Sequence, residues 1–137
     1  LPDAMIASTE LHVLCLVTLF TLLLWLPYVL ARIATRGLMA TMGNPDPLLP
    51  PDPPWAQRAK LAHQNAIENL AVFAPLVLIV AVMGISTPST VLAVKLYLGA
   101  RVVHYIVYAA GVPVLRTLAF FVGVAACLML AMAVLGR

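Results

Sequence analysis

Four long apolar runs dominate the chain of 137 residues, and short polar or proline-rich stretches separate them. They predict helices at about 10–38, 55–83, 88–110 and 114–135. A helix needs about 20 mostly apolar residues to cross a bilayer, and each run reaches that length. The pattern therefore predicts an all-α fold in which residues 1–137 form a single four-helix transmembrane domain.

The composition favours a membrane protein over a soluble one. Hydrophobic residues make up 64% of the chain and charged residues only 9%, against about 25% charged residues in a typical soluble domain. The net charge of +3 is small and spread along the chain, which argues against binding of nucleic acid. Cys15 and Cys127 lie inside apolar runs without metal-ligand spacing, so we expect them to pack and we expect no metal site.

The connections between the runs predict how the protein lies in its membrane. The first connector, 43–55, holds six prolines in thirteen residues and is expected to be extended. The N-terminus carries Asp3 and Glu10, and the second connection carries no charge. Basic residues lie beside the first and third connections: Arg32, Arg36, Arg58, Lys60 and Arg116. Because basic loops stay in the cytoplasm, these two connections are predicted to be cytoplasmic and both termini to lie outside.

The second apolar run begins with a stretch, 58–75, that carries polar side chains into the membrane. At helical spacing Asn65 and Asn69 fall on one stripe with Glu68 at its edge, whereas His63 and Lys60 point the other way. A charge at the bilayer centre costs on the order of 2.5–3.5 kcal/mol. We therefore expect this stripe to face protein, a cavity or the interface rather than lipid.

The third run has a polar aromatic face, and it approaches the same side of the membrane. Its members at helical spacing are Tyr97, Arg101, His104, Tyr105 and Tyr108. Arg36 ends the first run, and Arg116 and Thr117 begin the fourth, so the predicted topology places all these groups in one leaflet. Cations, a carboxylate and amides together suit a compact ligand that bears carboxylates and an amine.

Two other interpretations stay open at this point. The polar residues could join helices through interhelical hydrogen bonds, or the basic ends could only anchor the topology. A proton or ion pathway is disfavoured, because it requires polar groups across the whole span and the opposite half of the runs is almost free of them.

The same residues resemble the signature of the membrane-associated eicosanoid and glutathione metabolism family, to which microsomal glutathione transferases and prostaglandin E synthase belong. The match covers all four runs in order. In the second run it comprises Arg58, Ala62, His63, Asn65 and Glu68, followed by Phe73 and Pro75. In the third run it comprises Arg101, Val102, Val103, His104 and Tyr108. Pro113, Arg116 and Thr117 match the start of the fourth helix, and Asn44-Pro45 aligns Arg36 with an arginine that ends the family's first helix.

The resemblance implies a homotrimer that binds glutathione between subunits near the cytoplasmic face. The predicted binding residues are Arg36, Asn65, Glu68, Asn69, Arg101, His104, Tyr105 and Tyr108. Arg116, with Thr117 beside it, would stabilise the thiolate, and Tyr108 is a further candidate for that role. An adjacent guanidinium favours the charged form of a thiol whose free pKa is about 8.5.

The resemblance implies a glutathione-dependent transferase or peroxidase that attacks a lipophilic electrophile delivered from the membrane lipids. The proline-rich connector is distinctive. The chain looks more like the bacterial members of the family, which implies a bacterial inner membrane. The alternative is a non-catalytic lipid-binding scaffold or accessory membrane protein of the same family, because fold kinship alone does not fix function.

Overall fold

The computed structural model describes residues 8–137, so that Asp3, used above for the orientation, lies outside the described residues. The described part of the chain is all-helical, as predicted. Its elements are α2 (Thr9–Leu23), α3 (Trp25–Arg36), the short α4 (Leu38–Met42), α5 (Pro54–Val82), α6 (Pro88–Ala110) and α7 (Pro113–Leu135). Four spans are long and apolar enough to cross a membrane, the first made of α2 and α3 together. The prediction of a four-helix membrane fold is confirmed.

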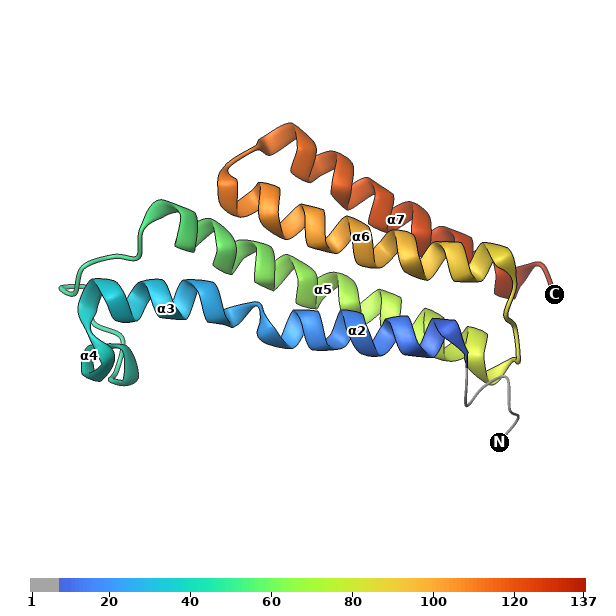
Figure 1. Cartoon of the computed structure of the whole chain (residues 1–137), viewed down its shortest axis with the longest axis horizontal. Helices are drawn as coiled ribbons and strands as arrows, with labels where there is room; N and C mark the ends of the chain where they lie inside the picture. Colours follow the sequence, from blue (N-terminus) through green and yellow to red (C-terminus); the bar gives the residue numbers. More distant parts are fainter. Residues whose placement is uncertain (1–7) are drawn as a thin grey trace.

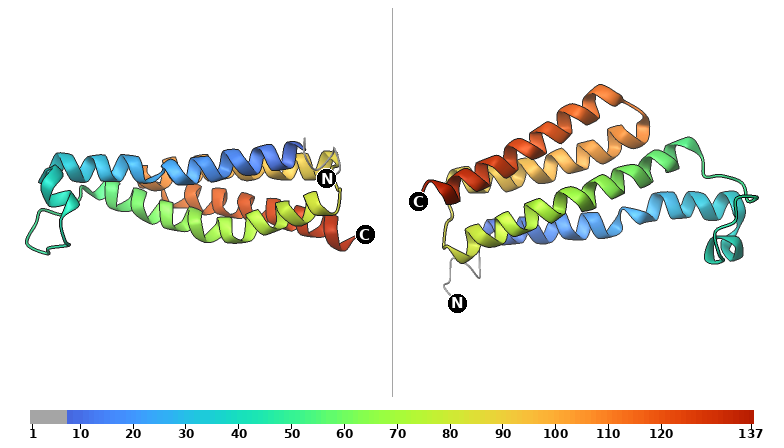
Figure 2. Two further views of the ribbon diagram at one scale, coloured as in Figure 1. Left: turned by 90° about the horizontal axis from the view of Figure 1, so that it is seen from below. Right: turned by 180° about the vertical axis from the view of Figure 1, so that it is seen from behind.

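The helices run side by side along one long axis (Figure 1). The start of α2 and the end of α7 lie at one end of the bundle, called here the terminal end. The opposite end, called the connector end, holds α4, the proline-rich segment, the start of α5 and the turn between α6 and α7 (Figure 2).

The first span is interrupted where its sequence contains Pro27. Leu24 separates α2 from α3, and its N–H bonds to the Thr21 carbonyl at 3.3 Å. Proline lacks an N–H and crowds the preceding turn, which accounts for a break at this place. The Tyr105 hydroxyl of α6 donates to the Leu24 carbonyl at 3.1 Å, so the interruption is tied to the neighbouring helix.

The boundaries of the later helices follow local sequence signals. At the start of α6, the Thr87 hydroxyl accepts from the Thr90 N–H, and the Thr90 hydroxyl accepts from the Thr87 N–H, which is a capping box. Gly111 ends α6 with φ of 84°, a left-handed conformation that favours glycine. Pro88 and Pro113 occupy first-turn positions, where a missing N–H costs little.

The apolar core lies in the half of the bundle toward the terminal end. It brings together Val17 of α2, Phe73 and Val77 of α5, Tyr97 of α6 and Leu130 of α7. The rings of Phe73 and Tyr97 stack with centroids 3.7 Å apart. Toward the connector end the packing changes to small side chains on α5, among them Ala59 and Ala62, which let helices approach closely. Large apolar side chains such as Leu22 and Ile106 point outward, as expected of helices in lipid.

Candidate functional site

A groove of about 380 Å³ opens between α5, α6 and α7 in the half of the bundle near the connector end. Its lining residues are Asn65, His104, Tyr108, Arg116, Thr117, Phe120 and Phe121. Five of these were predicted as binding or catalytic residues. The groove therefore combines amide, imidazole, phenol and guanidinium groups with an aromatic wall, a mixture suited to a ligand with both polar and apolar parts.

Arg101 lies beside this groove and is almost completely buried, with 3% of its surface exposed. One terminal nitrogen donates to Asn65 Oδ1 at 2.8 Å, and the same nitrogen lies 3.3 Å from His104 Nδ1. Gly123 of α7 packs beside this side chain, and a Cβ there would lie 4.0 Å from Arg101 Cδ, an ordinary van der Waals contact. Arg101 thus fixes two groove residues, Asn65 and His104, from behind.

The amide of Asn65 has a defined orientation. Its Oδ1 atom accepts from Arg101 and also from Asn69 Nδ2, at 3.2 Å. Because both partners are donors, the oxygen must face them, and the NH₂ group of Asn65 is turned away from both. Asn65 lines the groove, so its NH₂ group is a donor available to a carboxylate or carbonyl there.

Aromatic contacts hold the rim of the groove. His104 and Tyr108, one helical turn apart on α6, meet edge to face with centroids 5.5 Å apart. The Arg116 guanidinium lies over the Tyr108 ring, with Cζ 4.4 Å from its centroid, a cation–π contact that restricts the long side chain. The Thr117 hydroxyl donates to the Pro113 carbonyl at 3.1 Å, which leaves its oxygen as an acceptor.

The remaining predicted residues lie outside this groove. Tyr105 faces α2, where its hydroxyl bonds to Leu24 and its ring meets Phe20 edge to face. Asn69 lies one turn deeper on α5 and lines a separate, mostly apolar groove of about 340 Å³ with Cys127. Glu68 is exposed on the outer surface of this chain. Arg36 lies in another cavity, described next.

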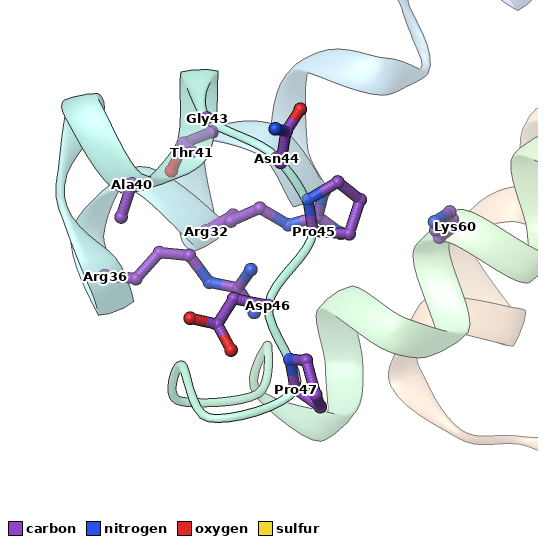
Figure 3. Close-up of a pocket in the computed structure, with 10 residues that line it drawn as sticks. All are labelled: Arg32, Arg36, Ala40, Thr41, Gly43, Asn44, Pro45, Asp46, Pro47 and Lys60. Atoms are coloured by element: carbon purple, nitrogen blue, oxygen red, sulfur yellow. The ribbon is translucent and has the colours of Figure 1, made fainter.

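That second polar site is a cavity of about 440 Å³ at the connector end (Figure 3). It is called here the connector cavity, and Arg32 and Arg36 of α3, Lys60 of α5 and Asp46 of the connector are among its lining residues. Arg32 pairs with the buried Asp52 at 2.7 Å. The hydrogen bond from Arg32 holds the pKa of Asp52 below its ordinary value, and the charges of Arg32, Arg36 and Lys60 act in the same direction.

Sequence reasoning missed several polar contacts and one wall of the groove. Phe120 and Phe121 follow Thr117 by one helical turn, a spacing that would have placed them on the groove. At the terminal end, Glu10 of α2 is completely buried and accepts from Ser86 at 3.0 Å and from Thr90 at 2.8 Å. The expectation that the half opposite the predicted site is almost free of polar groups overlooked this cluster.

The fold and the groove define a multi-pass membrane protein with a polar groove between three of its spans. The model of the MAPEG family matches residues 12–136, and the chain belongs to that family. It is also 35% identical over 68 residues to "Microsomal glutathione S-transferase 1" of Homo sapiens and, to the same extent, to the protein of that name from Sus scrofa. Each match covers 49% of this chain and 44% of the relative.

Proposed function

We propose that this protein is a membrane-bound, glutathione-dependent transferase or peroxidase whose thiol cofactor binds in the groove between α5, α6 and α7. One observation carries the proposal: the groove gathers the Asn65 amide, His104, Tyr108 and Arg116 from three helices. The membership of the MAPEG family and the names of the two relatives support the choice of glutathione.

Glutathione carries two carboxylates, one amine and one thiol, and the groove offers matching partners. The Asn65 NH₂ group and the Arg116 guanidinium suit carboxylate or thiolate acceptors. Phe120 and Phe121 supply an apolar wall on which a lipophilic second substrate can lie. Buried Arg101 contributes positive charge to the site while staying covered by Asn65 and His104.

The proposed chemistry begins with loss of the thiol proton beside Arg116. The thiolate sulfur then attacks the electrophilic carbon of a lipophilic substrate, a sulfur–carbon bond forms, and the leaving group departs with its electron pair. With a lipid hydroperoxide, the thiolate attacks the terminal oxygen and the O–O bond breaks. A second glutathione then converts the sulfenic acid to a disulfide and water, so two thiols are oxidised and the peroxide is reduced to an alcohol.

The proposal includes a homotrimer in a bacterial inner membrane, with the groove toward the cytoplasm. Glu68 supports association, because it is exposed on this single chain although it lies within a span, where a charge facing lipid is costly. A neighbouring subunit would cover it and bring polar groups to it, as the predicted role of Glu68 in glutathione binding requires. Native mass spectrometry in mild detergent should give three chains per particle, and a monomer contradicts this part of the proposal.

The deciding experiment is titration of the purified protein with glutathione by calorimetry, together with the ultraviolet absorbance of the bound thiolate. We expect saturable binding, thiolate at neutral pH, and conjugation of chlorodinitrobenzene or reduction of a lipid hydroperoxide. S-methylglutathione is the control, because it fills the same groove and cannot ionise. Absence of glutathione binding in a folded oligomer would instead favour the non-catalytic lipid-binding protein.

A further inference from the structure

The connector cavity has a ligand chemistry of its own, separate from that of the groove. Three cations, Arg32, Arg36 and Lys60, border it, with Arg32 and Arg36 entering from α3 and Lys60 from α5 (Figure 3). Two carboxylates, Asp52 and Asp46, lie near these cations. Asp52 accepts three hydrogen bonds from Arg32: from Nε to Oδ1 at 3.0 Å, from Nε to Oδ2 at 3.3 Å and from Nη2 to Oδ2 at 2.7 Å. Asp46 Oδ1 accepts from the Leu48 N–H at 2.9 Å.

Two of the cations retain unused capacity. Arg36 donates from one terminal nitrogen to the Pro50 carbonyl at 2.7 Å, and the same nitrogen lies 4.0 Å from Asp52 Oδ1. Its Nε is buried and has no partner among the described residues. Its side chain is only 15% exposed, so this nitrogen cannot simply be satisfied by bulk water. Lys60 is exposed and makes no ion pair within residues 8–137. The cavity is therefore a positively charged site with donors left for an anion.

Exposed apolar side chains of α4, next to the cavity but not part of its lining, indicate which anion it takes. The helix α4 contributes Ala40 and Thr41 to the cavity lining, and its other side chains are apolar and exposed. Met39 is 77% exposed, Met42 65% and Leu38 54%. Arg36 is the last residue of the first span, and Lys60 lies in the second turn of the second span, so both are close to the level at which lipid headgroups lie. A small free anion makes no favourable contact with these exposed apolar groups, whereas the acyl chains of a lipid do.

We propose that the connector cavity binds an anionic phospholipid, with its phosphate between Arg36 and Lys60 and its acyl chains against the apolar side chains of α4. Basic pockets between spans recognise anionic headgroups by this combination of charge and hydrocarbon contact. The bound lipid holds the proline-rich connector to the membrane surface beside the glutathione groove. This inference uses no residue that lines the groove. It does use Arg36, which the resemblance assigned to glutathione, so the lipid and glutathione are competing assignments for that side chain and the variants at Lys60 and Arg36 separate them.

The test measures retention of phosphatidylglycerol and phosphatidylcholine by the purified protein with native mass spectrometry. The wild type should retain phosphatidylglycerol preferentially. Lys60→Gln should weaken that retention about fivefold, since one surface cation contributes on the order of 1 kcal/mol to such binding, and Lys60→Arg should preserve it. Asp46→Asn should strengthen retention, because it removes a negative charge and keeps the side-chain acceptor for Leu48. Lys95→Gln is the matched control, an exposed lysine of α6 outside the cavity.

Three results overturn the proposal. Equal retention by Lys60→Gln and Lys95→Gln would show that the cavity does not select the headgroup. Full competition by inorganic phosphate, with no effect of Met39→Ser, would make it a site for a small free anion. Loss of glutathione binding in Arg36→Gln, with lipid retention unchanged, would assign the cavity to glutathione at a subunit boundary. Lys60 is exposed and forms no ion pair within residues 8–137, so its variants keep the test decisive if Arg36→Gln is unstable.

Discussion

Asn69 orients the side-chain amide of Asn65 through a hydrogen bond from its Nδ2 atom to Asn65 Oδ1 at 3.2 Å, and the same Nδ2 atom donates to the Asn65 backbone carbonyl at 2.9 Å. Asn69 does not line the groove, whereas Asn65 does. Within a single chain, Asn69 would therefore affect a ligand in the groove only through Asn65. Direct contact between Asn69 and glutathione stays a prediction for the assembled trimer.

Replacing Asn69 by Leu should weaken glutathione binding about fivefold, because a lost orienting hydrogen bond is worth about 1 kcal/mol. Asn65→Leu should weaken it more, since it removes the donor itself. In the Asn65→Leu background, Asn69→Leu should have little further effect. Calorimetry on the four proteins forms a double-mutant cycle, with Gln64→Leu, an exposed amide of the same helix, as control. Additive losses would mean that Asn69 contacts the ligand directly.

A second prediction concerns Glu10, which joins α2 to the start of α6. Glu10→Leu would remove the acceptor of the exposed Ser86 hydroxyl and one of two acceptors of the buried Thr90 hydroxyl, which also donates to the Thr87 carbonyl at 3.0 Å. The net loss of such a hydrogen bond is worth about 1 kcal/mol. We expect a clear fall of the thermal midpoint, followed by circular dichroism in detergent. Glu10→Gln should fall less, because its amide oxygen still accepts. His12→Gln, an exposed change on the same helix, should leave the midpoint unchanged, and equal effects of Glu10→Leu and His12→Gln would argue against the role.

The contribution of Asp52 to the free energy of unfolding should depend on pH. Its pKa is lowered in the folded protein by Arg32, so its contribution is fully present above the unfolded value of about 3.9 and is lost as pH falls through the lower folded value. Asp52→Asn should therefore destabilise the protein by about 1 kcal/mol at neutral pH. The difference from wild type should persist down to about pH 4 and should shrink only as pH falls further, through the lower folded pKa. A difference that stays constant from neutral to acidic pH would assign the effect to packing instead.

The parts of the fold and of the site that depend on residues close together in the sequence could be predicted, and the parts that depend on distant residues could not. Span lengths and helical spacing are local, so the four spans and the shared face of Arg101, His104 and Tyr108 followed from sequence. The helix ranges predicted for 55–83, 88–110 and 114–135 lie within one residue of α5, α6 and α7. The first range was predicted as one helix, 10–38, whereas the structure ends α2 at Leu23, ends α3 at Arg36 and starts α4 at Leu38.

Contacts between distant parts of the chain were not predictable in this way. Helical spacing placed Tyr105 with the polar face of its helix, but the break at Leu24 supplies an acceptor on the first span that draws the hydroxyl there. The pairing of Arg32 with Asp52 depends on how the proline-rich connector folds back. No pattern within α2 alone indicated that Glu10 meets Ser86 and Thr90, because those partners lie far along the chain.

The predicted orientation can be tested with single cysteines in a background where Cys15 and Cys127 are replaced by Ser. Leu48 is 91% exposed in the connector and Leu135 is 83% exposed at the end of α7. An impermeant maleimide added to intact cells should label Leu135→Cys and spare Leu48→Cys, with both labelled after lysis. The reverse pattern would place the connector and the groove outside the cell.

The last prediction concerns the thiolate. Arg116 lies over the Tyr108 ring at the rim of the groove, and a guanidinium there lowers the pKa of a bound thiol by favouring its charged form. Arg116→Ala should leave glutathione bound but mostly protonated at neutral pH, so the ultraviolet titration of the thiolate should move to higher pH. Conjugation of a model electrophile at neutral pH should slow roughly tenfold for every tenfold fall in the fraction of ionised thiol. The loss should shrink at high pH, where the thiol ionises without help.

Arg116→Lys should give an intermediate titration, because it keeps the positive charge and loses the planar group that stacks on Tyr108. Tyr108→Phe keeps that aromatic surface and removes the hydroxyl, so it separates the two candidates: an unchanged thiol titration in Tyr108→Phe leaves Arg116 as the activating group. A thiolate that forms normally in Arg116→Ala and changes its titration only in Tyr108→Phe would reverse the assignment. Thr117→Val tests the remaining predicted residue. The Thr117 hydroxyl proton is already donated to Pro113, so we expect an unchanged thiol titration, and a shifted one would give Thr117 a part in stabilising the thiolate.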